Sequence, residues 1–115
     1  MERLIAAFQN SVRAFRRLAK TETAFQQELI LLVASIPLAA FLAQSWIGYL
    51  VLVGSVVVLM IVEVLNTGIE AACDAVSLEF RDHIQLAKDC GSLAVLLTIF
   101  LVAAIWLTAI YNVLF

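Results

Sequence analysis

The sequence predicts an all-α membrane protein, in which an N-terminal amphipathic helix is followed by three membrane-spanning helices. Hydrophobic residues make up 64% of the 115 residues and charged residues 14%, whereas soluble domains average roughly 45–50% apolar and about 25% charged residues. The charges gather in residues 2–28 and 63–89, so that residues 29–62 and 90–115 carry none. Charge-free stretches of this length are typical of membrane spans. A chain this short is expected to form a single membrane domain over residues 1–115.

Residues 1–20 are predicted to form the amphipathic helix. Apolar residues recur there at three- and four-residue spacing, namely Leu4, Ile5, Phe8, Val12, Phe15 and Leu18. Basic residues gather on another side, namely Arg13, Arg16, Arg17 and Lys20. This pattern favours a helix that lies flat on an anionic membrane surface. Packing of the same apolar face on the rest of the protein is the alternative, and both can hold together.

Three spans follow from the apolar stretches. Residues 29–62 would measure about 51 Å as one helix, which exceeds a hydrocarbon core of roughly 30 Å. We therefore expect a break near Gln44–Trp46, with spans over residues 26–43 and 46–75. Residues 88–111 form the third predicted span, and residues 77–87 are expected to be a polar connection.

The basic residues predict the orientation of these spans. Five of the seven lie in the N-terminal segment, and Arg81 and Lys88 lie at the connection between the second and third spans. Because basic residues favour the cytosolic side of a membrane, the N-terminus and this connection are predicted to be cytosolic.

A row of polar residues interrupts the second span, and we call it the acidic row: Glu63, Asn66, Glu70 and Asp74. Their spacing places them within an arc of roughly 80° on one helix face. An unpaired carboxylate in a span costs on the order of 3 kcal/mol and usually marks a functional site. Three carboxylates and an amide also suit a hard divalent cation. The orientation places the row near the cytosolic boundary, where a soluble nucleotide and a lipid headgroup can both reach it.

Two further motifs join the acidic row to a known family. The stretch Glu63–Asp74, together with Ala87–Ser92 and Glu22–Glu28, closely resembles the bacterial integral-membrane diacylglycerol kinases, and the resemblance covers nearly the whole chain. It implies a homotrimer in the bacterial inner membrane, with a cytosolic active site shared between protomers. The implied reaction transfers the ATP γ-phosphate to the hydroxyl of diacylglycerol, with Mg²⁺, and gives phosphatidic acid for phospholipid biosynthesis. No nucleic-acid partner is expected.

The resemblance also implies roles for individual residues. Glu63 matches the proposed general base, and Asn66 an essential polar residue beside it. Glu22 and Glu70 match the carboxylates that hold the metal on ATP. Nucleotide-binding positions match Arg3, Asn10, Glu22, Glu70, Glu79, Phe80, Arg81, Lys88 and Asp89. Lipid-binding positions match Arg3, Glu28, Glu63 and Ser92. On the surface helix, Ala6 stands where a lysine is common, and Asn10 and Val12 stand where aromatic residues are common.

The residues themselves leave simpler explanations open. Asp74 could pair with Lys88 or Arg81, Asn66 could be a hydrogen-bonding residue between helices, and Glu28 could be solvated at the start of the first span. The chain has no Walker A or GxGxxG motif, so metal and side chains would have to hold a nucleotide.

Two other functions stay open as well. The first is an undecaprenol kinase with the same chemistry, although the Glu22–Glu28 segment looks more like the diacylglycerol branch. The second is a small, non-enzymatic membrane oligomer that conducts ions or has a regulatory role.

Overall fold

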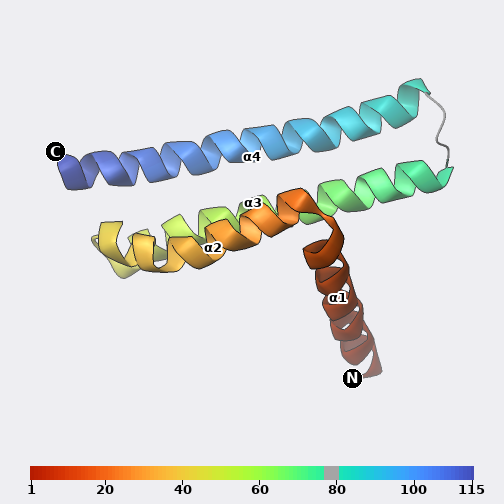
Figure 1. Cartoon of the computed structure of the whole chain (residues 1–115), viewed down its shortest axis with the longest axis horizontal. Coiled ribbons are helices and arrows are strands. Elements are labelled where there is room, and N and C mark those ends of the chain that lie inside the picture. Colours follow the sequence, from red (N-terminus) through yellow and green to blue (C-terminus); the bar gives the residue numbers. More distant parts are fainter. Residues whose placement is uncertain (77–80) are drawn as a thin grey trace.

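The computed structural model describes residues 1–76 and 81–115, and all regular structure in these ranges is helical. Four helices follow one another, namely α1 (Glu2–Thr21), α2 (Thr23–Leu42), α3 (Trp46–Val76) and α4 (Asp82–Leu114). Helices α2, α3 and α4 are long and apolar enough to cross a membrane. The predicted all-α membrane architecture is therefore confirmed. In Figure 1, α2, α3 and α4 run side by side while α1 projects away from them.

A single residue separates α1 from α2. Glu22 has an extended backbone, with φ −104° and ψ 110°, and it ends one helix and begins the next. Across this bend, Gln26 Nε2 donates to Ala19 O at 2.9 Å. The ring of Phe15 also packs edge-on against that of Phe25, with centroids 5.5 Å apart. These contacts hold the bend, and they place the Glu22 carboxylate at the corner where α1 leaves the other helices.

Local hydrogen bonds explain where α3 begins. Helix α2 ends at Leu42, and Ala43 is extended. Gly48 N donates to Ser45 Oγ at 3.0 Å, so the Ser45 hydroxyl satisfies one of the free N–H groups in the first turn of α3. The helix then continues to Val76, and its last turns carry the polar end of the acidic row.

Helix α4 begins at Asp82, six residues before the predicted start at Lys88. Residues 82–87, which we expected to belong to the polar connection, are thus the first turns of this helix. Gln85 N donates to Arg81 O at 2.9 Å, and Asp82 lies in the first turn, where the helix dipole favours a negative charge. The helix extends beyond its apolar stretch because intrahelical hydrogen bonds satisfy its backbone whatever its side chains contact.

The interior of a single chain is small. The apolar side chains that are buried among the described residues are Phe25, Ala39, Leu52, Val56 and Leu59. Large apolar side chains are exposed on all four helices, and the residues of α4 that are buried are Gly91 and Thr98. These faces suit contact with lipid or with further protein chains, because lipid tails are as apolar as the side chains themselves.

One polar contact joins α3 to α4 far from the acidic row. Trp106 Nε1 donates to Leu52 O at 3.2 Å and to Ser55 Oγ at 3.1 Å. The Ser55 hydroxyl in turn donates to Leu52 O at 2.7 Å. Hydrogen bonds between helices matter in a membrane because lipid offers no other partner for such groups.

We expect Trp106→Phe to lower the free energy of unfolding by about 0.6–1.7 kcal/mol, because both indole hydrogen bonds between α3 and α4 are lost. Titration with sodium dodecyl sulfate in mixed micelles, followed by circular dichroism, measures this change. Trp46→Phe is the matched control, since Trp46 is 70% exposed and stacks only on Tyr49 of the same helix. Equal effects of the two substitutions would contradict a special role for the Trp106 hydrogen bonds.

Candidate active site

Burial decreases along the acidic row. Glu63 and Asn66 are buried, with 8% and 9% of their surface exposed, whereas Glu70 and Asp74 are exposed. The arrangement of the helices explains this gradient, because α3 extends past the bend between α1 and α2 (Figure 1). The first two residues of the row therefore lie between helices, and the last two lie beyond the cover of α2.

Carboxylates from two segments meet around Glu63. This side chain lies within electrostatic range of Glu70 on its own helix and of Glu22 at the α1–α2 bend. Glu28 on α2 interacts electrostatically with Glu63 as well. Carboxylates that are spread over residues 22–70 of the sequence thus interact electrostatically in the fold, and Glu63 is their common partner.

Glu28 is buried, with 7% of its surface exposed. Its Oε1 atom has no hydrogen-bond partner in the part of the chain that the structure describes. The alternative of a solvated Glu28 at the start of the first span is therefore wrong. Helix α2 begins at Thr23, so Glu28 lies in its second turn. Its side chain is buried within electrostatic range of Glu63 on α3.

Asn66 contacts both α3 and α4. Its Nδ2 donates to Glu70 Oε1 at 3.4 Å, one turn further along α3. Its Oδ1 lies against Gly91 of α4 and accepts no hydrogen bond from the described residues. Within residues 1–76 and 81–115, the Asn66 side chain thus makes no hydrogen bond to another helix, contrary to the alternative of a hydrogen-bonding residue between helices. The amide instead points its donor at a carboxylate of the row.

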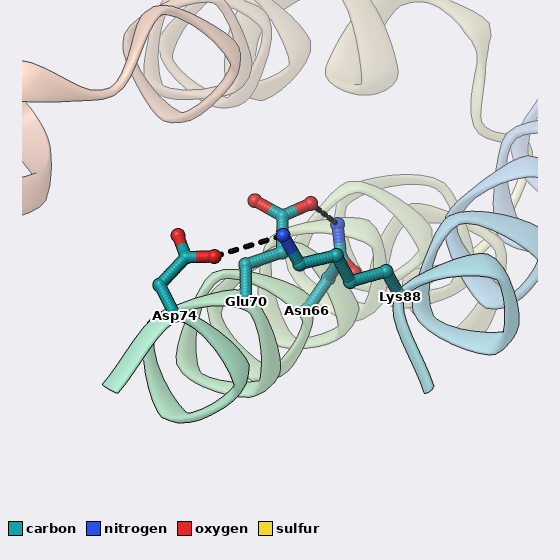
Figure 2. Close-up of polar contacts among 4 residues, drawn as sticks. All are labelled: Asn66, Glu70, Asp74 and Lys88. Atoms are coloured by element: carbon teal, nitrogen blue, oxygen red, sulfur yellow. Dashed lines mark hydrogen bonds and ion pairs between the residues drawn. The ribbon is translucent and has the colours of Figure 1, made fainter. Parts of the chain in front are cut away.

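Lys88 of α4 spans the gap to the far end of the row. Its Nζ lies 2.8 Å from Asp74 Oδ1, and Figure 2 shows the side chain extending from α4 toward Asp74, close to Glu70. Both partners are partly exposed, at 41% and 48% of their side chains. The predicted pairing of Asp74 is therefore present, with Lys88 and not with Arg81. Solvent weakens such an exposed ion pair, so a phosphate group can compete for the ammonium.

The donor set at the solvent edge fits a magnesium ion that arrives with a nucleotide. Mg²⁺ usually takes one or two protein carboxylates and completes its shell with phosphate oxygens and water. Glu22 is half-buried and Glu70 is exposed, so both can reach such an ion. No group of three or more His, Cys, Asp or Glu residues is placed to hold a metal within the described ranges.

The remaining predicted residues lie at different distances from the row. Asp89 and Ser92 are exposed on α4, and Arg81 precedes the first turn of this helix. Arg3 and Asn10 are exposed on α1, where Asn10 Oδ1 accepts a hydrogen bond from Arg13 Nη2 at 2.7 Å. Arg3 is nineteen residues from Glu22, roughly 28 Å along a helix. The N-terminal end of α1 therefore lies away from the row of its own chain (Figure 1).

Three further residues bear on the site, namely Glu79, Phe80 and Gly91. Glu79 and Phe80 fall outside the described residues. Sequence reasoning did not single out Gly91, against which the Asn66 side chain rests. A signal was present, because a glycine inside a helix is unfavourable and often marks a packing or functional need.

Comparison with known proteins places the chain in a family. The family model described as prokaryotic diacylglycerol kinase matches residues 9–110. The diacylglycerol kinase of Escherichia coli strain K12 is 34% identical over 110 residues, which cover 96% of this chain and 90% of that protein. That of Haemophilus influenzae is 32% identical over 103 residues, covering 90% and 87%. That of Pseudomonas aeruginosa is 33% identical over 108 residues, covering 94% and 88%.

The match covers the acidic row, the α1–α2 bend and the first turns of α4, and among the predicted site residues only Arg3 lies outside it. The relatives are also matched over nearly their whole length. The chain belongs to the prokaryotic diacylglycerol kinase family.

Proposed function

We propose that this protein is an ATP-dependent diacylglycerol kinase, which transfers the γ-phosphate of ATP to the lipid hydroxyl and forms phosphatidic acid. Family membership supports this proposal. The observation that carries it is the position of Glu63, which is buried within a membrane-type helix and lies within electrostatic range of the more exposed carboxylates Glu22 and Glu70. Such a site offers one end to a lipid and the other to a soluble nucleotide.

Glu63 is proposed as the general base. A lipid hydroxyl is a weak nucleophile until a neighbouring group accepts its proton, and a carboxylate can do so within hydrogen-bond reach. Glu63 is the most deeply placed carboxylate of the acidic row, so a hydroxyl carried by a membrane lipid meets it first. Glu28 and Ser92 are proposed to contact the lipid headgroup.

Glu22 and Glu70 are proposed to hold Mg²⁺ on ATP. When bound, the ion neutralises the charge that develops on the β- and γ-phosphates during transfer. These two residues would bind the ion at the solvent edge of the site, where the bend between α1 and α2 brings Glu22 toward α3. Asn66 orients Glu70 through its Nδ2 hydrogen bond.

Lys88 is proposed to release Asp74 and then to bind a phosphate group of the nucleotide. Phosphoryl transfer depends on positioning and on neutralisation of charge, and the Lys88 ammonium already lies within electrostatic range of Glu70. Asp74 then serves to hold Lys88 over the row before the nucleotide arrives. Further nucleotide contacts are proposed for Asp89, Glu79, Phe80 and Arg81.

A homotrimer in the bacterial inner membrane is proposed as the working form, with the N-terminus and the site on the cytosolic side. Two observations support more than one chain. Large apolar faces are exposed on every helix, and the N-terminal end of α1, which carries Arg3, projects away from the other helices of its own chain (Figure 1). A neighbouring copy can supply α1 to the row, and thereby complete the contacts to ATP and lipid.

The proposed reaction is tested by phosphorylation of purified lipids in detergent, with radiolabelled ATP. We expect diacylglycerol to be phosphorylated in preference to undecaprenol, no product in the presence of EDTA, and recovery on addition of excess Mg²⁺. Preference for undecaprenol would replace the proposed substrate. Absence of phosphorylation of any lipid would favour a non-enzymatic membrane oligomer.

Glu63→Gln is expected to lower kcat by about 10²–10⁴-fold, which is the usual contribution of a general base. ATP binding and the helical content should be retained, because the amide has nearly the same shape. Steady-state kinetics and equilibrium ATP binding measure the two effects. The matched control is Glu2→Gln, an identical chemical change at an exposed position of α1. Full activity of Glu63→Gln would overturn its assignment as base.

Lys88→Met is expected to raise the KM for ATP about tenfold or more, because a cation for the phosphates is lost. Asp74→Asn should change it less than about threefold, since an exposed ion pair contributes little. Initial rates over a range of ATP concentrations separate the two variants. An equal loss in both would show that Asp74 itself takes part in nucleotide binding.

A further inference from the structure

Gly91 differs from the other glycines of the chain. It is buried, and a Cβ atom at this position would collide with Asn66 Oδ1 and lie 3.1 Å from Asn66 Cγ. At Gly54 and Gly68 a Cβ would meet nothing within 4 Å, and at Gly48 the nearest atom is Ser45 Oγ at 3.3 Å in the preceding turn. Only at Gly91, therefore, does a side chain from another helix occupy the space that a Cβ would need.

The side chain in that space is Asn66 of the acidic row. Its carbonyl oxygen rests on the Gly91 backbone without a hydrogen-bond partner among the described residues. A backbone Cα–H group makes weak contacts with oxygen atoms at helix interfaces, and glycine permits the closest approach. The other end of the same amide donates to Glu70 Oε1. The amide is thus held between the backbone of α4 and a carboxylate of α3.

We propose that Gly91 is a positioning residue for the reaction: its lack of a side chain lets the Asn66 amide lie between α3 and α4 with its NH₂ group toward Glu70. The inference rests on the proposed function in one respect, namely that Glu70 is the carboxylate oriented for the metal–nucleotide complex. The contact itself depends only on the packing of α3 against α4.

The geometry also determines what a methyl group at this position would do. The atom that it meets is the end of a flexible side chain, and its three nearest neighbours all belong to Asn66. The backbones of α3 and α4 can therefore keep their places while the amide rotates away. Alanine is also a better helix former than glycine. Gly91→Ala should accordingly disturb the site and leave the fold intact.

The contact is tested by nuclear magnetic resonance in detergent micelles on protein labelled with ¹⁵N-asparagine. The chain has three asparagines, Asn10, Asn66 and Asn112, so that three side-chain NH₂ pairs are expected. Gly91→Ala should shift the Asn66 pair and leave the Asn10 and Asn112 pairs in place. The matched control, Gly54→Ala, should shift none of the three. An unchanged Asn66 pair in Gly91→Ala would overturn the proposal.

The consequence for catalysis is tested on the same variants. Gly91→Ala is expected to lower kcat by about 10- to 100-fold, because a misplacement near 1 Å at a reacting site can cost about 100-fold. The KM for diacylglycerol should change less than about twofold, and Gly54→Ala should match the unsubstituted protein. A shifted Asn66 resonance with unchanged kcat would refute the role in the reaction. If the unsubstituted protein phosphorylates no lipid, the proposed function fails, while the resonance experiment still decides the contact.

A double variant covers the case in which Gly91→Ala does not fold. Thermal unfolding of Asn66→Ala/Gly91→Ala is then compared with that of Asn66→Ala alone. If the collision is with Asn66, removal of the Asn66 side chain makes a methyl group at position 91 harmless. The double variant should then unfold at the same temperature as Asn66→Ala or at a higher one. Failure of the double variant to fold would show that another group fills the space, and the proposal would be wrong.

Discussion

The placement of Glu63 is the constraint on which the rest of the structure depends. A carboxylate in a helix suited to lipid is costly unless protein or water surrounds it, and Glu63 is buried. Helix α2 covers this part of α3, and the bend at Glu22 ends that cover where the row becomes exposed. The same arrangement brings Glu63 within electrostatic range of further carboxylates. The place that shields Glu63 from lipid is therefore also the place where metal, nucleotide and lipid are proposed to meet.

Besides the Asp74–Lys88 ion pair, two contacts define how α3 lies against α4. Asn66 rests on Gly91 near the site, and Trp106 donates to Ser55 at the other end of the interface. From Asn66 to Leu52, whose carbonyl oxygen also accepts from Trp106, α3 advances about 21 Å, and from Gly91 to Trp106 α4 advances about 22 Å in the opposite direction. Apolar faces alone would let two helices slide in lipid. Specific polar and close backbone contacts therefore set the register that brings Lys88 over the row.

The single chain carries an incomplete set of groups for the proposed chemistry. Glu63 lies within electrostatic range of Glu22 and Glu70, while the N-terminal end of α1, which carries Arg3, projects away from the other helices. The exposed apolar faces of α2, α3 and α4 leave ample surface for further copies. The proposed trimer relates these two facts, because the copies that cover the apolar faces also bring their surface helices near a neighbouring row. Association and completion of the site would then be the same event.

The sequence by itself determined the helices, the break near Gln44–Trp46, the polar connection after the second span and the acidic row. Periodicity and charge are properties of neighbouring residues, so they can be read without the fold. The sequence did not indicate that α4 begins at Asp82, ahead of the predicted span over residues 88–111, since a helix can continue beyond its apolar stretch. Only the tertiary structure decided that Glu28 is buried and that Asp74 pairs with Lys88. The same holds for the contact between Asn66 and Gly91. These features depend on how helices that are far apart in the chain pack against one another. A local sequence pattern contains no information about such packing.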